Sequence, residues 1–477
     1  MNQLKMIAID EWRYWIRSRL ALSVLLIGLL LVVSSALLTA SKMSAATHDR
    51  THQQLLAEET FYNQPARHPH RMIHYGHYVF RTPPPLSIVD PGVDAYTGTA
   101  IFLEGHGQNG AMFADKQSSA GLADFGSITP SFILQTIAPL LLILMGYNVI
   151  TRERETRTLD QLIAQGVTQT QLLVGKGFAL ASVAILMLSP VAIAMVIAIL
   201  QGEAFSIAGF FLAGYALYLL IWCILIIFSS SIMRIRNASL GVLLGLWGIT
   251  ALLMPPLAGT TAKSIVNAPT KIETDFNILQ AMSNIGDGHN AADPSFASLR
   301  ANMLSQYNVD SIEKLPVNFR GVVAQAAEAD LTDVLNKFAE DQMHIELSQS
   351  RIARGFGWLS PVLGIRDLSM TLAGVDLETH HRFLREAEQI RFDFVQSLNK
   401  AHAEKLAYSD DINRSSDPKS EQRTRISAEN WQALKEFRFK PASAKTRFTA
   451  SLPPLLKMLV WLLFAVGLCA TVGRRAL

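Results

Sequence analysis

Cysteine is almost absent from this chain of 477 residues, which contains only Cys223 and Cys469. Both lie inside apolar runs, so the polar parts of the chain can form neither a disulfide framework nor a cysteine-based zinc site. The two thiols are expected to pack as small buried hydrophobic side chains. An excess of charge of one sign is lacking as well: the net charge is only +3, and no basic run with interleaved aromatic residues occurs. Nucleic acid is therefore not an expected partner.

The chain also lacks a phosphate-binding loop for ATP. The nearest approach is Gly175-Lys176, but Gly177 follows the lysine where Ser or Thr is required, and Thr170 stands where the first glycine should be. No Ser-His-Asp or paired-carboxylate pattern stands out. We therefore expect that this chain is not an enzyme by itself and that it binds no cofactor.

Apolar sequence, in contrast, is abundant: half of the residues are hydrophobic and only 17% are charged. Six runs are long enough to cross a bilayer, which takes about 20 mostly apolar residues. They are residues 20–40, 130–150, 178–201, 206–229, 238–257 and 453–472. None carries a Lys, Arg, Asp or Glu in its central part, so an ion-coupled transporter with a buried charge is not indicated.

Lysine and arginine residues near the short loops orient the six spans. The connection 201–205 on one side has only Glu203, whereas the other side collects Lys5, Arg13, Arg17, Arg19, Arg152, Arg154, Arg157, Lys176, Arg234, Arg236, Arg474 and Arg475. Both termini, residues 151–177, the turn 229–237 and the tail 473–477 are therefore predicted to be cytoplasmic. Residues 41–129 and 258–452 are predicted to form two large external domains, which would be periplasmic if the chain lies in a bacterial inner membrane.

Residues 1–19 are predicted to form an amphipathic helix in the cytoplasmic membrane interface. Its apolar face, predicted to contact lipid, contains Leu4, Ile7, Ala8, Trp12, Trp15 and Ile16, and its polar face contains Asp10, Arg13 and Arg17. The alternative is a signal peptide cleaved near Ser44-Ala45-Ala46. An uncleaved first span is favoured because the apolar run is longer than a typical signal sequence.

A charged segment, TRERETRTLDQLIAQGVTQTQLLVGK (151–176), separates spans two and three. Residues 152–165 are predicted to form one helix, supported by the i,i+4 spacing of Glu153 and Arg157. An apolar stripe on that helix consists of Leu159, Leu162 and Ile163. Gly166 is predicted to end it, and a second short helix over 169–174 is predicted to lead into span three. The alternative to a docking site is an ordinary solvated loop helix.

The chain resembles the membrane subunit of a type-2 ABC exporter in four features. These are the interfacial helix, the six spans, the E-R-E-x-x-T-L run after span two and the Gly-Lys that opens span three. This permease family also includes the copper-enzyme maturation permeases. The residues that carry the resemblance are Glu153, Arg154, Glu155, Thr158, Leu159, Gly175 and Lys176. The resemblance implies that residues 152–166 are a coupling helix, which docks in a groove of a separate ATP-binding subunit that holds ATP and Mg²⁺. The expected coupling residues are Glu153, Arg154, Glu155, Thr158, Leu159 and Leu162.

The resemblance also implies a second permease subunit, identical or paralogous, and outward transport. Candidates for lining the translocation path are the polar residues Ser34, Ser35, Gln135, Thr136 and Asn148, for which packing between helices is the alternative. One departure from the family pattern is that both long external segments are large. The stretches 69–80, 90–92, 104–109 and 372–383 resemble a bacterial subgroup whose external domain has no assigned function.

Histidine is concentrated in the first external segment, which holds seven of the twelve. Four of them are candidate Zn or Cu ligands, because they would converge if their stretch were helical: His68, His70, His74 and His77. However, Pro65 and Pro69 interrupt that stretch, and residues 75–80 alternate like a strand. Hydrogen-bonded loop histidines are therefore the alternative. The glycine-rich stretch 104–110 is predicted to be a loop that returns towards span two.

The second external segment is predicted to be mostly helical. Residues 355–374 are predicted to form a helix on the outer leaflet or over the exit, because Pro361 and Arg366-Asp367 argue against a seventh span. Residues 409–446 are predicted to be a mobile loop, and His380-His381 with Glu378 a solvated cluster.

The expected fold is mainly α: a six-helix transmembrane permease with an N-terminal interfacial helix, a coupling helix and two external domains, the first partly β. The first hypothesis for function is the permease subunit of an ATP-driven exporter. One alternative is an ABC-coupled binding or mechanotransmission protein that acts on a periplasmic partner. The other is a metal-delivery permease that uses the His68–His77 cluster.

Overall fold

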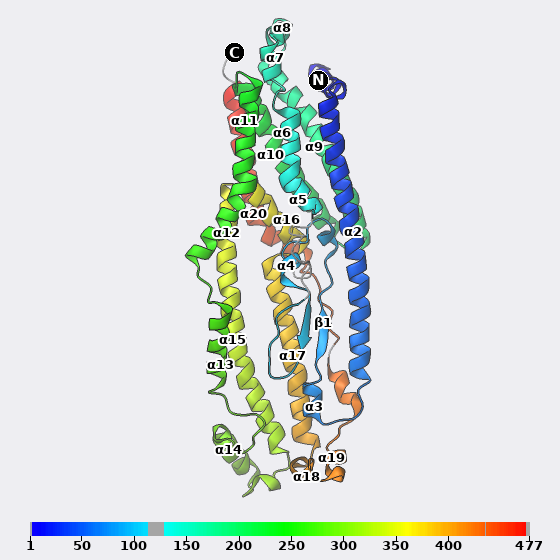
Figure 1. Cartoon of the computed structure of the whole chain (residues 1–477), viewed down its shortest axis with the longest axis vertical. Coiled ribbons are helices and arrows are strands. Elements are labelled where there is room, and N and C mark those ends of the chain that lie inside the picture. The colour runs from blue at the N-terminus through cyan, green and yellow to red at the C-terminus, as the bar shows by residue number, and fades with distance from the viewer. Residues whose placement is uncertain (1, 113–127, 435, 474–477) are drawn as a thin grey trace.

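The computed structural model describes residues 2–112, 128–434 and 436–473. The molecule is elongated, with a bundle of apolar helices at one end and a second unit, here called the distal unit, at the other (Figure 1). In the described part of the chain, six helical segments are long and apolar enough to cross a membrane, as predicted. Arg474 and Arg475, which contributed to the predicted orientation, lie outside the described residues.

The bundle begins with α1 (Asn2–Arg17) and α2 (Arg19–Tyr62), whose first half is span one. Span two consists of α5 (Pro130–Phe132), a π-helical turn (Ile133–Ile137) and α6 (Ala138–Gly146), and it leads into α7 (Thr151–Glu155) and α8 (Thr158–Ala164). Spans three and four are α9 (Gln169–Leu200) and α10 (Phe205–Ile232). Span five consists of α11 (Arg236–Trp247), a second π-helical turn (Gly248–Leu253) and α12 (Met254–Ile265), and span six is α20 (Ala444–Gly473).

Helix α10 is the centre of the bundle, where it packs against α9, α20, α6 and α16. Tyr215, Tyr218 and Trp222 on this helix are completely buried. A helix that is apolar on all sides is suited to such a position, because each of its faces meets other helices. The central placement of α10 leaves the outer faces of α2, α9, α11 and α20 to contact lipid.

The distal unit contains a small sheet and a set of helices. Its first part consists of α3 (Pro69–Ile73), β1 (His77–Phe80), a 3-10 turn (Pro85–Ile88), α4 (Asp94–Thr97) and β2 (Ala100–Leu103). Strands β1 and β2 are antiparallel, with His77 opposite Leu103 and Phe80 opposite Ala100. The prediction that the first external segment is partly β is therefore confirmed.

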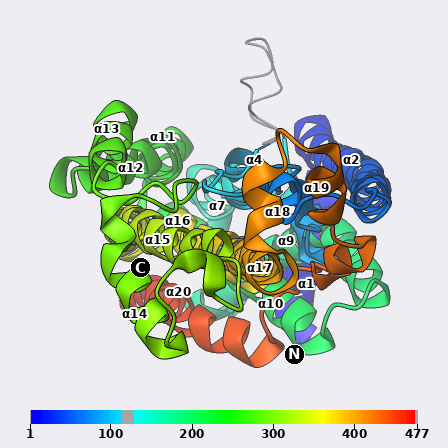
Figure 2. The ribbon, with the colours of Figure 1, turned by 90° about the horizontal axis from the view of Figure 1, so that it is seen from below.

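The second part of the distal unit is helical, as expected. Its α-helices are α13 (Lys271–Met282), α14 (Ala297–Tyr307), α15 (Phe319–Gly355), α16 (Pro361–Ala373), α17 (Leu377–Lys405), α18 (Tyr408–Asn413) and α19 (Pro418–Arg423). Short 3-10 turns cover Pro294–Phe296, Ile312–Lys314, Phe356–Trp358 and Ala428–Ala433. The two long helices α15 and α17 pack side by side in the middle of the unit, with α2 on one side and α11–α13 at the other edge (Figure 2).

The two long segments form one unit instead of the two separate domains that the sequence suggested. Helix α2 continues without a break beyond the membrane span, and Phe61 near its end packs in one apolar core with Met72 of α3 and Phe394 of α17. A second shared core joins Val79 of β1 to Phe383 of α17. Because neither segment encloses these side chains alone, the segments are expected to fold together.

Three further predictions for this unit are corrected. Helix α16, within the predicted surface segment 355–374, is mostly buried because it packs between α10 and α20. The segment 409–446, expected to be a mobile loop, contains α18 and α19 and inserts the fully buried Trp431 into the apolar core around Phe61. His380 and His381, expected to be solvated, are also buried, and His381 pairs with Glu346 of α15 at 2.7 Å.

Candidate functional site: the loop end, the polar interior and the distal histidines

Helices α1, α7 and α8 lie at the end of the bundle farthest from the distal unit, next to the last turns of α20 (Figure 1). We call this the loop end. Helix α8 projects beyond the neighbouring helices in this view. The segment that carries the family resemblance is therefore the most protruding part of the loop end.

A buried network of four charges holds the loop end together. Glu11 of α1 and Lys176 of α9 are 0% and 2% exposed, and the Lys176 Nζ lies 2.5 Å from the Glu11 carboxylate. The same Nζ lies 2.9 Å from Glu153 of α7, and Arg152 pairs with Glu11 at 2.9 Å and with Glu153 at 3.1 Å. Two carboxylates and two cations balance one another, which is the condition under which buried charges are tolerated.

The other residues of the E-R-E run attach α7 to spans four and five. The guanidinium of Arg154 donates hydrogen bonds to the backbone carbonyls of Ser231 and Met233 at the end of α10. The carboxylate of Glu155 accepts hydrogen bonds from the backbone and the side chain of Arg236 at the start of α11. Each residue of the run thus has a different partner helix. The expected Glu153–Arg157 pair is not formed, because Glu153 pairs with Lys176 instead.

The predicted single helix over 152–165 is in fact two helices. Arg157 has a left-handed backbone (φ 58°), which separates α7 from α8. Gly166 (φ 86°) ends α8, as predicted. The second short helix predicted over 169–174 is not separate from span three, because α9 begins at Gln169 and continues through Gly175. At Gly175 a side chain would collide with Ile7 of α1, so the glycine permits the close packing of these two helices.

The candidate coupling residues fall into two groups by exposure. Thr158 donates a hydrogen bond to Glu153 at 2.5 Å, and Leu159 is buried under α8. Leu162 is partly buried, whereas Ile163, which was placed on the same stripe, is 45% exposed. Most of the residues singled out by the motif therefore hold the loop end together, and α8 presents a different, exposed face that includes Ile163.

The tryptophans of α1 face the protein and not the lipid. Trp15 is buried and donates a hydrogen bond to the Met145 carbonyl, and Trp12 donates one to the Ser182 hydroxyl. This correction has a physical reason: each indole N–H finds a fixed acceptor in the bundle, which the lipid interior does not offer. Ile16 is exposed, as predicted.

The candidate path residues are dispersed. Ser34 is exposed on the outer side of α2, Ser35 donates a hydrogen bond to the Ile128 carbonyl, and Asn148 is buried near the loop end. Only Gln135 and Thr136 lie together, both in the π-helical turn of span two. A path lined by all five residues is therefore not formed in this structure.

The π-helical turn frees backbone carbonyls that ordinary helical hydrogen bonds would occupy. The carbonyl of Gln135 accepts a hydrogen bond from the Tyr218 hydroxyl, and that of Thr136 accepts one from Trp247 at the start of the second π-helical turn. The side chain of Gln135 donates to the Tyr215 hydroxyl at 2.9 Å. Spans two, four and five thus meet at this turn.

A cavity of about 620 Å³ borders the π-helical turn, between the bundle and the distal unit. Its lining is mixed, with Gln135, Thr136, Asp90 and Arg366 among apolar side chains. The Ser369 hydroxyl bridges Tyr215 to Asp90, which connects the bundle to the distal unit through a buried polar chain. Residues 90–92 carry part of the family resemblance, but no pattern in the sequence marks Asp90 or Ser369 as a site residue.

The four candidate metal ligands do not form one site. His68 is buried and pairs with Asp411, together with His402. His77 lies in β1 against the ring of Phe61, 5.1 Å between ring centroids. Only His70 and His74 lie together, one helical turn apart, with 3.1 Å between their Nε2 atoms.

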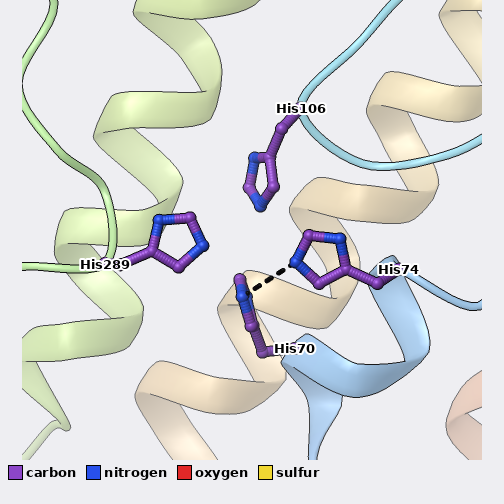
Figure 3. Close-up of side chains that lie close together, drawn as sticks. All are labelled: His70, His74, His106 and His289. Carbon is purple, nitrogen blue, oxygen red and sulfur yellow. Dashed lines mark hydrogen bonds between the residues drawn. The ribbon is translucent and has the colours of Figure 1, made fainter.

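His70 and His74 are joined by two histidines that the sequence analysis missed (Figure 3). His106 comes from the glycine-rich loop after β2, and His289 comes from the loop after α13. The only signals in the sequence were the local patterns Gly105-His106-Gly107 and Asp287-Gly288-His289. Neither pattern indicates that the two loops would meet.

Comparisons with known protein families agree with this architecture. A family model described as "ABC-2 family transporter protein" matches residues 5–297, which is more than half of the chain. A second model, a domain of unknown function (DUF3526), matches residues 271–440 in the distal unit. No curated protein matches the chain significantly. The chain therefore belongs to the ABC-2 family of transporter proteins, as a membrane permease subunit that works with an ATP-binding subunit of an ABC transporter.

Proposed function

We propose that the chain is the permease of an ATP-driven exporter and that α8 docks on the ATP-binding subunit. In this proposal the loop end is cytoplasmic and the distal unit is periplasmic. The observation that carries the proposal is that α7 and α8 differ in their contacts at the loop end. Helix α8 projects with an exposed face, while α7 is bonded to α1, α9, α10 and α11.

This arrangement supports a mechanism in which α8 receives force and α7 distributes it. A push on α8 would reach span three through Glu153 and Lys176, and spans four and five through Arg154 and Glu155. Ion pairs and hydrogen bonds of fixed geometry transmit displacement better than a flexible loop, because the helices cannot move independently. ATP and Mg²⁺ would be held by the partner subunit, since no phosphate loop occurs in this sequence.

A second copy of the permease, identical or paralogous, is part of the proposal. Span five is the least buried of the six spans. Beyond the span, α13 exposes Ile272, Phe276 and Leu279 in one stripe with helical spacing. An exposed apolar stripe of this kind is suited to contact with another protein. Helices α11–α13 lie at the edge of the molecule, where a second copy can approach them (Figure 2).

The docking proposal is tested by co-purification with the ATP-binding subunit in mild detergent, followed by an ATPase assay. Ile163→Asp places a charge on the exposed face of α8, and we expect it to abolish co-purification. The matched control is Ile412→Asp, since Ile412 of α18 is 47% exposed but lies in the distal unit. A Glu153→Ala/Glu155→Ala double variant removes the contacts of α7 with Lys176 and Arg236, and we expect ATPase activity to fall because a push on α8 no longer reaches spans three and five.

Two results would overturn the docking proposal. One is a chain that purifies alone, without ATPase activity, under several detergent conditions. The other is an Ile163→Asp variant that binds the ATP-binding subunit as tightly as the wild type does.

One observation favours a second candidate function, in which the distal unit acts on a periplasmic partner. Helix α2 runs unbroken for 44 residues from the loop end into the distal unit, a length of about 66 Å. Such a rod can carry movement from the ATP-binding subunit to the distal unit. Vesicles reconstituted with both subunits distinguish the two functions. ATP-dependent movement of a solute supports the exporter, whereas ATP-dependent protease sensitivity of the distal unit without solute movement supports mechanotransmission.

A further inference from the structure

We propose that His70, His74, His106 and His289 bind one divalent transition-metal ion that prefers imidazole ligands, such as Zn²⁺. This site differs from the His68–His77 cluster that the sequence suggested. The proposal is independent of the transport direction and of the docking of α8, because the site lies wholly within the distal unit.

The four rings approach a common point from three segments of the chain (Figure 3). One ring nitrogen from each histidine lies within 4.8 Å of those of the other three. A tetrahedral zinc ion with bonds of about 2.0–2.1 Å places its ligand nitrogens roughly 3.4 Å apart. The His70–His74 distance of 3.1 Å is close to that value. The wider pairs, up to 4.8 Å apart, would have to close by up to about 1.4 Å on metal binding.

In two of the four histidines, the ring nitrogen that faces away from this point is already engaged with a carboxylate. The Nδ1 of His106 lies 2.9 Å from Glu328, and the Nδ1 of His289 lies 3.1 Å from Asp287. The other nitrogen of His106, Nε2, is buried and has no hydrogen-bond partner among the described residues. Histidines that bind zinc commonly have this arrangement: one ring nitrogen faces the metal and the other is held by a carboxylate. The carboxylate fixes the tautomer and the orientation of the ring.

The ligand set itself indicates the class of metal ion. The ligand set contains no thiolate, and its only carboxylates stand behind the rings. Mg²⁺ and Ca²⁺, which prefer oxygen ligands, are therefore poor candidates.

Two glycines allow the loops to approach. A side chain at Gly105 would collide with Ile73 of α3, and the Gly105 N–H donates a hydrogen bond to the Ile73 carbonyl at 3.1 Å. A side chain at Gly288 would meet Ala327 of α15 at 2.7 Å. Each glycine immediately precedes a proposed ligand, so the close approach of the backbone positions the imidazole. A bound ion would join α3, the loop after β2 and the loop after α13.

A second group, His68, His402 and Asp411, is a weaker candidate. Asp411 already accepts hydrogen bonds from both histidines and from Asn318, and the Nδ1 of His68 accepts one from the backbone of His70. Metal binding there would break these bonds. We therefore assign this group a structural role as a buried hydrogen-bonded network.

The test uses the full chain, purified in mild detergent with a histidine-free affinity tag and stripped of metal by a chelator. Zn²⁺ is titrated against a chromophoric zinc indicator, and Co²⁺ is added separately to obtain its absorption spectrum. We expect one tightly bound Zn²⁺ per chain and a visible Co²⁺ spectrum of tetrahedral type. Bound Zn²⁺ should also raise the thermal unfolding midpoint, since a ligand of the folded state stabilises it.

The variant His74→Ala/His289→Ala removes the two exposed ligands, which makes misfolding a small risk. We expect its Zn²⁺ affinity to fall at least about 100-fold, and that of Asp287→Asn to fall about 10- to 100-fold. The matched control, His48→Ala/His344→Ala, removes two exposed histidines outside the cluster and should bind like the wild type. Unfolding midpoints in chelator confirm that each variant is folded.

Three outcomes would overturn the proposal. The first is a folded wild-type chain that binds no Zn²⁺ in stoichiometric amount. The second is a His74→Ala/His289→Ala variant whose Zn²⁺ affinity equals that of the wild type. The third is tight binding that disappears in His402→Gln but persists in His74→Ala/His289→Ala, which would place the ion on the His68–Asp411 group.

Discussion

Removing Lys176 is expected to detach α1 from the bundle. Lys176 is 2% exposed and contacts two carboxylates, that of Glu11 at 2.5 Å and that of Glu153 at 2.9 Å. In Lys176→Met the completely buried Glu11 keeps only Arg152 as a partner, and Arg152 must then serve two carboxylates. Breaking a buried charge pair by removing one partner costs about 3–5 kcal/mol.

The double variant Glu11→Gln/Lys176→Met is expected to be less harmful than the sum of the two single variants. It leaves Arg152 paired with Glu153 at 3.1 Å, so no buried charge is unbalanced. We expect the two effects to be non-additive by about 1–3 kcal/mol, as is typical of residues in one charge network. This non-additivity separates an electrostatic role of Lys176 from a packing role, which the double variant would not restore.

Cleavage by chymotrypsin after Trp12 and Trp15 measures the detachment of α1. Both indoles are held by hydrogen bonds within the bundle, so cleavage requires α1 to open. Under conditions in which reclosing is fast, the cleavage rate follows the population of the open form. A loss of about 3 kcal/mol then raises the rate at least about 100-fold. Lys5→Met, which changes an exposed lysine of the same helix, is the control.

A Lys176→Met variant cleaved at the wild-type rate would refute this account of the loop end. Equally damaging would be a double variant whose effect is the sum of the two single effects. In either case the four charges would not act as one network.

Three further predictions concern other parts of the molecule. Burial lowers the pKa of His77 to about 4, so the unfolded chain takes up a proton at higher pH than the folded one. The free energy of unfolding therefore decreases as the pH falls from about 6.5 to about 4. His77→Phe should therefore reduce the acid sensitivity of thermal unfolding by roughly 3 kcal/mol over that range, and an unchanged pH profile would contradict the assignment. Thr136→Cys places a thiol at the 620 Å³ cavity and should react with a membrane-impermeant thiol reagent faster than the wild type does. The two wild-type thiols are protected, since Cys223 is buried and Cys469 is partly buried. Equal labelling would mean that the cavity is closed to solvent. If two copies pair through the exposed stripe of α13, as proposed, Phe276→Asp should lower the mass measured by light scattering in detergent from that of a dimer to that of a monomer. An unchanged mass would argue against this stripe as the contact.

The sequence by itself determined the architecture of the bundle. Six apolar runs predicted six spans, since a bilayer imposes a length and a composition on each. The E-R-E run between spans two and three identified the family, which the family model then confirmed. Gly166 correctly predicted the end of α8, because a left-handed backbone costs least at a residue without a side chain.

Contacts between distant segments were decided only by the tertiary structure. The partner of Glu153 is Lys176, 23 residues away, and not Arg157, because the left-handed backbone at Arg157 turns the helix there. The amphipathic pattern of α1 would suit packing against lipid as well as packing against the bundle. Only the hydrogen bond from Trp15 to the Met145 carbonyl shows that Trp15 faces inward.

The histidines show the same limit most clearly. Sequence spacing grouped His68, His70, His74 and His77, yet each local element sends its side chains to a different neighbour. His70 of α3 and His74, which caps the end of that helix, lie on one side of it, whereas β1 directs His77 to an apolar core. Their partners His106 and His289 are 183 residues apart in the chain, and they meet only because Gly105 and Gly288 allow two loops to approach α3 and α15. Spacing along a chain specifies which residues share a helix face, but it carries no information on which loops pack together.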